Sequence, residues 1–404
     1  MPFILATVLI DMMAIGLIIP AMPFLVAQFA DTPANQAYAL GLVAFSFGIA
    51  NFFGSPILGA LSDRYGRRPV LLIGFSGLAL SFFITAVANA LWMLVVVRLI
   101  SGAMQANASV AQAYVADITA PEDRARSFGL LGAAFGMGFI LGPVMGGLLG
   151  SIKLELPFIV AGCLALLNWV YGYFVLPESL AADQRKPFAW KRANPVAAFR
   201  GLTQLQGVRP LVAVVALSGM AQYILHATWV LYTSFKFGWG PKENGWSLMA
   251  VGVASTLVQG WLLKHLLQRF AAEKLAAMGL VSSALAFLCW GLATEGWMMF
   301  AVIAVNLLGF AVANVVQSMI SQAADARSQG QTMGAVASLN SLMAVAAPVV
   351  GAALLGLGST HLGDGGGRWL VGLPFYFCAF LQLCATVVAY RFFKHRSALA
   401  AGAA

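Results

Sequence analysis

Long runs of hydrophobic residues fill almost the whole of this 404-residue chain. A helix that crosses a bilayer needs about 20 such residues, and charged residues, glycine and proline separate twelve runs of that size. The pattern therefore predicts an all-α integral membrane protein with twelve transmembrane helices. The predicted spans are 3–29, 36–61, 70–89, 91–118, 125–151, 157–176, 210–236, 244–267, 273–294, 297–322, 328–354 and 372–393.

The order of the runs predicts two six-helix bundles. A polar and basic stretch at 177–209 separates an N-terminal bundle, residues 1–176, from a C-terminal bundle, residues 210–404. Bundles repeated in this way are typical of transporters and disfavour a channel built of subunits around a filter. We interpret the stretch between them as a cytoplasmic linker.

A weak internal repeat agrees with this division. The string GPVMGG at 142–147 resembles APVVGA at 347–352, so that Pro143 matches Pro348 at an offset of 205 residues. A single six-residue string can match by chance, but chance does not explain why the offset fits the position of the linker. The repeat therefore favours a duplicated transporter.

The positions of the basic residues predict the orientation. The chain has 23 Lys and Arg and a net charge of +9. With both termini in the cytoplasm, 18 of the 23 lie on the cytoplasmic side, whereas the opposite loops hold only four: Lys153, Lys236, Lys242 and Arg368. This asymmetry follows the positive-inside rule. It accounts for the basic charge without nucleic acid and predicts a multi-pass membrane protein with both termini in the cytoplasm.

Asp11 and Arg98 are the two charged residues well inside predicted spans. A charge at that depth costs several kcal/mol unless it meets a partner or a water-filled cavity, which makes both residues candidates for proton coupling. Arg98 has a structural alternative, in which it anchors helices through backbone carbonyl groups. Residues Ser101, Gln105, Ser109 and Gln112 follow Arg98 at helical spacing and predict a polar stripe on one face of the span.

Polar residues at helical spacing also occur in the second half. They are candidates for substrate binding, together with Gln105 and Gln112 of the first half, although hydrogen bonds between helices are an equal alternative for any one of them. His226 is in addition a candidate proton carrier, and a packing histidine is at least as good an interpretation. The second-half candidates are Gln222, His226, Trp229, Gln259, Asn306, Asn314, Gln317 and Asn340.

The loop GALSDRYGRRP at 59–69 closely resembles the signature loop of the major facilitator superfamily. An ordinary basic loop is the alternative. The resemblance implies that Asp63 caps a helix of the second half and that Arg67 pairs with Asp117, which together form a cytoplasmic conformational latch. It also implies the major facilitator fold for the whole chain.

A glycine-rich span at 125–151 contains Gly142, Pro143, Gly146 and Gly147. Close packing of small residues explains the glycines but not the order G-P-x-x-G-G. This order resembles the motif typical of proton-coupled exporters within the superfamily. The resemblance favours export over import.

Further segments are similar to the tetracycline/proton antiporter group of drug exporters. They are IDMMAIGLIIPAMP at 10–23, ALWMLVVVRLISG at 90–102, GLLGAAFG at 129–136, WVLYT at 229–233 and FGW at 237–239. The resemblance implies a proton-coupled antiporter that exports amphipathic small molecules by alternating access. The chain departs from the group at Ser81, Ser255 and Ser283, where those exporters carry ionisable groups, and these departures disfavour tetracycline as the substrate.

Other functions remain as alternatives. A proton-linked symporter or facilitator that imports an organic acid or sugar would use Arg98 to bind an anion. A membrane enzyme is disfavoured, because the sequence has neither an HExxH motif nor paired carboxylates within the spans. The four cysteines lie in apolar runs without a CxxC pair. We therefore expect no enzyme, metal or cofactor, and a monomer whose partners are protons, a small-molecule substrate and membrane lipid.

Overall fold

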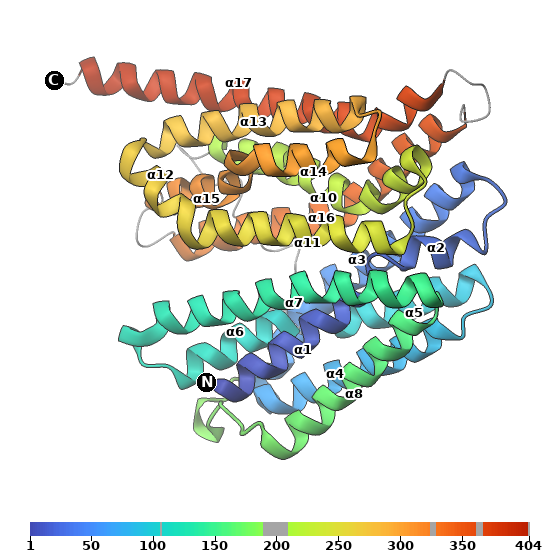
Figure 1. The fold of residues 1–404 in the computed structure, drawn as a ribbon. Coiled ribbons are helices and arrows are strands. Elements are labelled where there is room, and N and C mark those ends of the chain that lie inside the picture. The colour runs from blue at the N-terminus through green and yellow to red at the C-terminus, as the bar shows by residue number, and fades with distance from the viewer. Residues whose placement is uncertain (106, 189–208, 324–328, 361–366, 403–404) are drawn as a thin grey trace. The chain divides into compact units, whose positions relative to one another are not determined.

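The computed structural model describes residues 1–105, 107–188, 209–323, 329–360 and 367–402. Within these residues the secondary structure is helical, and twelve helices are long and apolar enough to cross a membrane. The all-α prediction and the twelve spans are therefore confirmed, with ends within a few residues of those predicted. We number these transmembrane helices 1 to 12 in chain order (Figure 1).

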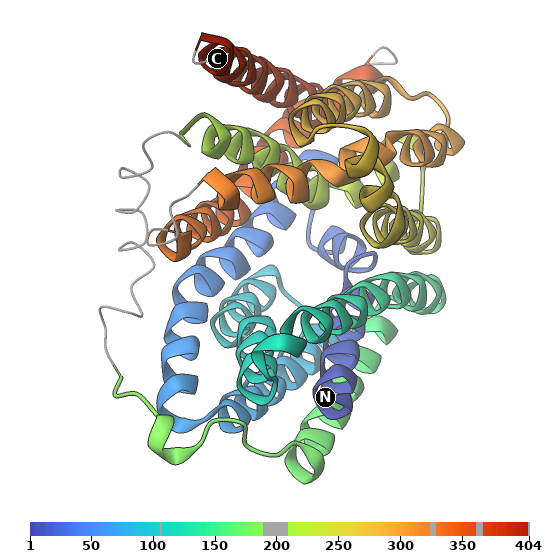
Figure 2. The same cartoon turned by 90° about the vertical axis from the view of Figure 1, so that its left-hand side faces the viewer.

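Transmembrane helices 1 to 6 comprise eight α-helical segments. They are α1 (Pro2–Ile18) and α2 (Met22–Ala27), α3 (Pro33–Tyr65), α4 (Arg67–Ala86), α5 (Leu91–Met104) and α6 (Asn107–Ile118), α7 (Arg124–Ile152) and α8 (Leu156–Val175). Short 3₁₀ turns η1 (Pro121–Asp123) and η2 (Ala182–Gln184) lie in the connections. Helix α1 packs against α7 and α8, as two views at right angles show (Figure 2).

Transmembrane helices 7 to 12 contain more interruptions. Their segments are α10 (Arg209–Phe237), α11 (Pro241–Leu257) with the π-turn η4 (Val258–Leu262) and α12 (Leu263–Arg269), α13 (Ala272–Leu292), α14 (Gly296–Val305) with the 3₁₀ segment η5 (Asn306–Ala311) and α15 (Val312–Ala323), α16 (Gln329–Ser359), and η6 (Gly367–Gly372) with α17 (Leu373–Gly402).

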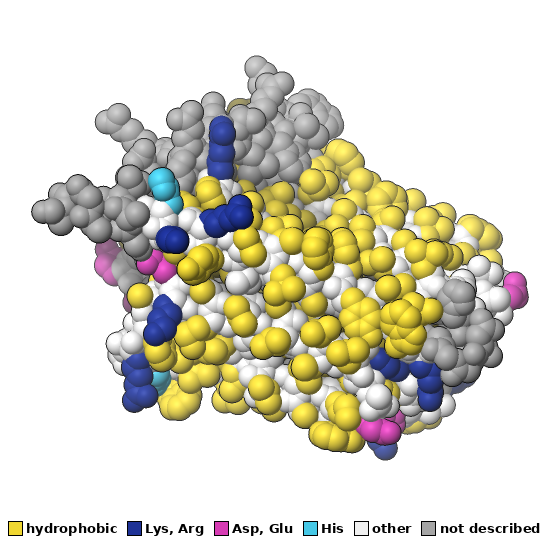
Figure 3. Space-filling model, turned by 90° about the horizontal axis from the view of Figure 1, so that it is seen from above, with side chains coloured by type: hydrophobic (Ala, Val, Ile, Leu, Met, Phe, Trp, Pro, Cys, Tyr) yellow, Lys and Arg dark blue, Asp and Glu magenta, His cyan; other side chains and the backbone are white. Residues whose placement is uncertain are grey.

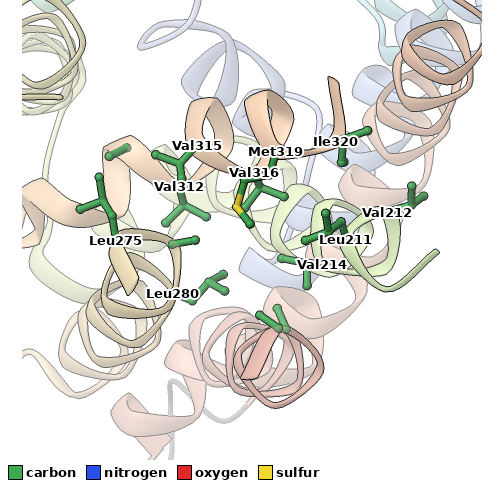
Figure 4. Close-up of a cluster of buried hydrophobic side chains, with 14 of the residues drawn as sticks. Leu211, Val212, Val214, Leu275, Leu280, Val312, Val315, Val316, Met319 and Ile320 are labelled. Atoms are coloured by element: carbon green, nitrogen blue, oxygen red, sulfur yellow. The ribbon is translucent and has the colours of Figure 1, made fainter. Parts of the chain in front are cut away.

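The chain forms two compact units, and each has its own core. The first unit contains Met1–Pro195 and Trp239–Gly252, and the second contains Val196–Gly238 and Val253–Ala404. In the second unit, branched side chains of α10, α13 and α15 meet in an apolar cluster (Figure 4). The cluster includes Leu211, Val214, Leu275, Leu280, Val312, Val316 and Ile320.

Large apolar side chains also lie on the outside. Leu285 of α13 and Phe380 and Leu383 of α17 are each more than half exposed. Hydrophobic side chains cover the middle of the face seen from above, and Lys and Arg gather towards its edges (Figure 3). Such a band would be unfavourable in water and is suited to contact with lipid.

Among the described residues, four transmembrane helices contain an irregular segment in their interior, and helix 12 begins with the 3₁₀ segment η6. Helix 1 divides at Ile19–Ala21, where Pro20 lacks a backbone N–H. Helix 4 divides between α5 and α6, helix 8 contains η4, and helix 10 contains η5. Irregular turns inside helices often mark functional hinges. The sequence analysis predicted twelve spans but not these interruptions.

The structure corrects the placement of Lys236. We expected it in a loop, but it lies in the last turn of α10 with 7% of its surface exposed. Its Nζ donates to the Gly291 carbonyl oxygen at 2.5 Å, near the end of α13. A cation is favourable there, because the last carbonyl groups of a helix lack partners within the helix. Of the predicted linker 177–209, residues 189–208 lie outside the described part of the chain.

Candidate functional site

The first candidate site surrounds Asp11 in helix 1. Asp11 and Asn107, the first residue of α6, are both buried, at 4% and 5% exposure. The Nδ2 of Asn107 donates to Asp11 Oδ1 at 3.0 Å. A small cavity adjoins the pair and is lined mainly by apolar side chains of α1, α4, α6 and α7. The arrangement holds a carboxylate in an apolar surrounding, where it can take up and release a proton.

The backbone of helix 4 is interrupted next to this pair. Gln105 has φ −91° and ψ 78°, outside the helical region. Its carbonyl oxygen accepts a hydrogen bond from Asn51 Nδ2 of α3 at 2.8 Å. An irregular turn within a membrane is tolerated only where its backbone groups find other partners, and Asn51 is one such partner. The candidate Gln105 thus contributes its backbone at this turn.

Arg98 does not meet Asp11. It lies on α5, and among the described residues no ion pair joins its guanidinium to a carboxylate. Ser101 of the same predicted stripe is buried, whereas Gln112 is exposed. The stripe was derived for a continuous helix, and the interruption at Gln105 separates its two halves. Proton coupling by Arg98 stays a prediction.

Sequence analysis missed Asn107. The residue has no charge and falls between positions of the predicted stripe. Two structural facts identify it: the bond to Asp11, and the packing of its side-chain oxygen against Gly74 of α4, where a Cβ would overlap that oxygen. A glycine opposite an amide cannot be recognised in one sequence, because the contact depends on how helices 3 and 4 pack.

The second-half candidates lie on several helices of the second unit. Trp229 is buried in an aromatic cluster with Trp290 and Phe375, and Asn306 accepts a hydrogen bond from Ser282 at 2.9 Å. Both have partners within the protein, as the structural alternative expects. Gln222 and Asn340 are partly exposed, whereas His226, Gln259, Asn314 and Gln317 are exposed. Gln259 donates to Ser255 Oγ at 2.6 Å.

The structure brings the three predicted latch residues together. Arg67 donates from Nη1 to Asp63 Oδ1 at 2.6 Å and from Nε to Asp117 Oδ2 at 3.0 Å. Ser62 accepts a further bond from the same guanidinium at 2.7 Å. Arg67 is 8% exposed, and such shielding from water strengthens an ion pair. Arginine suits the position because its planar fork serves several acceptors at once.

A third acidic residue, Glu178, belongs to this cluster and was missed. Its carboxylate accepts from the backbone N–H groups of Arg67 at 2.8 Å and Arg68 at 3.3 Å. It therefore occupies the N-terminus of α4, where free N–H groups favour an anion. Gly66, with φ 109°, packs so closely that a Cβ would overlap the carboxylate. The signal in the sequence was weak, because Glu178 lies 110 residues or more from its partners.

The four glycine-motif residues lie in α7. A Cβ at Gly142 would approach the Cα of Gly16 to 2.7 Å, and one at Gly146 would overlap the backbone of Leu17. A Cβ at Gly147 would in the same way overlap the backbone of Pro241. The glycines therefore allow α7 to pack directly on α1, the helix that carries Asp11.

Among the described residues, twelve helices able to cross a membrane, with a buried carboxylate in the first, are typical of a membrane transporter. Two curated proteins of Escherichia coli are similar over nearly the full length: the class C tetracycline resistance protein is 35% identical over 92% of this chain and 93% of its own, and the class B protein is 30% identical over 95% and 94%. The model of the Major Facilitator Superfamily matches residues 4–348 and 211–403. The chain belongs to this superfamily and to the family of these resistance proteins, and it is not an enzyme.

A solved structure agrees with the fold. The nucleoside transporter NupG has a TM-score of 0.79 over 97% of this chain and 98% of its own, at 14% sequence identity. This likeness supports the major facilitator fold predicted from the sequence.

Proposed function

We propose that the protein is a proton-coupled antiporter that exports amphipathic small molecules from the bacterial cytoplasm across the inner membrane. The observation that carries the proposal is the buried carboxylate of Asp11, which has one amide donor and an apolar cavity beside it. The similarity to tetracycline resistance proteins supports export of a drug-like molecule. The charge asymmetry supports cytoplasmic termini.

Asp11 is the proposed proton carrier. A proton taken up from the periplasm neutralises the carboxylate and favours one conformation, and its release to the cytoplasm restores the charge and favours the other. Each inward proton supplies about 1.4 kcal/mol per pH unit and about 2.3 kcal/mol per 100 mV. That is enough to move a drug against its gradient. Alternating access would then exchange one drug for one or more protons.

The predicted division of the chain and the other site residues enter the proposal in supporting roles. The two bundles, 1–176 and 210–404, would move against each other, with the cluster of Asp63, Arg67 and Asp117 as the cytoplasmic latch. Polar candidates of the second half, including Gln222 and Asn340, would contribute to substrate binding. We further propose that a monomer in contact with lipid is the functional form.

Transport by inverted membrane vesicles tests this function. Acidifying the vesicle interior should drive uptake of ethidium or another amphipathic drug, and a protonophore should abolish it. Vesicles without the protein give the background. Uptake of an organic acid or sugar together with protons, in right-side-out vesicles, would instead support the importer.

A further inference from the structure

The hydrogen bond between helices 1 and 4 connects the proposed proton site to an interruption in the backbone. Helix α5 ends at Met104 and α6 begins at Asn107, although the sequence across this region is apolar enough for one continuous span. The Gln105 carbonyl has a partner in Asn51. The interruption is therefore supported by a neighbouring helix, and the next described residue after Gln105 is the one that holds Asp11.

Gly74 fixes the position of the Asn107 amide. The side-chain oxygen of Asn107 lies directly against the Gly74 backbone, in the space that a Cβ would occupy. With its oxygen there, the amide directs Nδ2 at Asp11 Oδ1. A larger residue at position 74 would displace the amide, while the fold of α4 would tolerate alanine.

No other polar side chain competes for Asp11 among the described residues that surround it. Thr7, the other polar group in the cavity lining, donates to the Phe3 carbonyl at 3.0 Å. The titratable and charged side chains of the elements around Asp11 neither line the cavity nor bond to its carboxylate. They are Arg67, Arg68 and Tyr173 near the α4 start and α8 end, Tyr114 and Asp117 of α6, Arg124 and Arg126 of α7, and Cys163 and Tyr171 of α8.

We propose that Asn107 is a positioning residue that links the protonation of Asp11 to the interruption of helix 4, and that Gly74 provides the space for its amide. The inference rests on the proposed proton transport. A hydrogen bond to a charged carboxylate is about twice as strong as one to a neutral acid. When a proton binds to Asp11, this bond weakens and the start of α6 is held less firmly to helix 1. Deprotonation restores the bond.

Infrared titration of the purified full-length protein in nanodiscs tests the inference without any substrate. The acid C=O band of Asp11 is identified by its loss in Asp11→Asn. In Asn107→Ala the charged carboxylate loses its donor, so the midpoint of this band should move to higher pH by about one unit or more. Gly74→Ala should move it in the same direction by displacing the amide.

Matched variants separate this effect from general damage. Gly132→Ala adds a methyl group to α7 where no atom lies within 4 Å, and its midpoint should equal that of the wild type. Gly74→Ala added to Asn107→Ala should cause no further shift, because its target is already absent. An unchanged midpoint in both folded single variants, or additive shifts in the double variant, would overturn the inference.

Failure of this inference and failure of the proposed function give different results. If wild-type vesicles show no proton-driven uptake while the infrared midpoints shift as expected, the contact is established and the proposed transport is wrong. If uptake is proton-driven but the midpoints of both variants match the wild type, Asn107 does not position Asp11.

Discussion

The Asp11 carboxyl group is buried in an apolar surrounding, which disfavours its charged form but not its neutral form. A single amide faces it, and no cation among the described residues forms an ion pair with it. A carboxylate paired with arginine would stay charged through a transport cycle, because the cation stabilises the charge. One amide donor leaves both protonation states accessible, as a proton carrier requires.

Asp11→Asn should therefore abolish uptake that depends on the pH gradient, while exchange of drug down its own gradient continues. Asparagine has the size of aspartate but cannot release a proton. Inverted vesicles measure both activities in one preparation. His226→Ala, which removes a second titratable side chain, on α10, is the comparison variant and should damage coupling less than Asp11→Asn. If Asp11→Asn vesicles still accumulate drug on internal acidification, the proton carrier is another residue.

Single residues differ in how far the sequence predicts them. Asp11 and Arg98 are recognisable because a charge inside an apolar run is rare and costly, and Asp63 is recognisable because its loop resembles the signature loop of the superfamily. Asn107 is not, because the phase of the polar stripe changes at Gln105, where the backbone leaves the helix. The sequence shows which charges need a partner, but the packing decides which uncharged side chain supplies it.

At the scale of elements, the turn between α3 and α4 lies at the centre of one polar cluster. Arg67 binds Asp63 and Asp117 through its side chain and Glu178 through its backbone. The segment after α8 is held to the same turn, since Ser179 Oγ donates to Asp117 Oδ2 at 3.2 Å. The proposed latch is thus an assembly of the turn with the end of α6 and the segment after α8.

Neutralising the latch should impair export without unfolding the protein. Asp63→Asn removes one of the two carboxylates on Arg67, and export from vesicles should fall severely at normal membrane insertion. Arg67→Asp and Asp117→Arg should each do the same. Combined, they should recover part of the activity, though not all, because Asp63 would then face a carboxylate. Damage that simply adds up in this double-mutant cycle would refute the pairing.

The N-terminus of α4 allows a second test with a matched glycine. Gly66 and Gly238 both have positive φ, 109° and 69°, so alanine at either should cost about 1–3 kcal/mol of backbone strain. Only Gly66 also contacts the Glu178 carboxylate, whereas a Cβ at Gly238 meets no atom within 4 Å. Gly66→Ala should therefore lower the Tm in detergent more than Gly238→Ala, and impair export. Equal Tm values would argue against a stabilising role of Glu178.

Interrupted helices show the limit of prediction at this scale. The span predicted at 91–118 occupies Leu91–Ile118. Its interruption was not predicted, because hydropathy records only which residues avoid water. Its division depends on Asn51, a residue of another helix that satisfies the Gln105 carbonyl. The same holds for η5 in helix 10, where Ser282 of α13 bonds to Asn306.

At the scale of the whole molecule, the internal repeat reaches beyond the matching prolines. With the offset of 205 residues, Gly74 corresponds to Gly279, and Gln105 to a position within η5. A Cβ at Gly279 would lie 2.7 Å from the Leu308 carbonyl oxygen in η5. In each unit, a glycine of the third helix thus packs against the irregular turn of the fourth. The units differ in chemistry, because the position that corresponds to Asp11 at the same offset is Ala216.

The substrate is a property of the whole molecule, and serines stand at three positions where the resemblance implies ionisable groups. Ser81 of α4 and Ser283 of α13 are both buried, at 3% and 1% exposure, and Ser283 Oγ has no hydrogen-bond partner within the described structure. A metal–tetracycline chelate is cationic and would be held best by carboxylates. Hydroxyl groups with aromatic and amide side chains favour apolar or weakly cationic drugs through contact area.

Expression of the protein in a susceptible bacterium should therefore give little or no tetracycline resistance, and more resistance to a lipophilic cation such as ethidium. The minimal inhibitory concentrations of both compounds measure this preference. Asp11→Asn is the control, since resistance that survives in it does not come from coupled export. Vesicle uptake of tetracycline with and without Mg²⁺ then examines the chelate directly. Strong tetracycline resistance with Mg²⁺-dependent uptake would show that Ser81, Ser255 and Ser283 do not exclude the chelate.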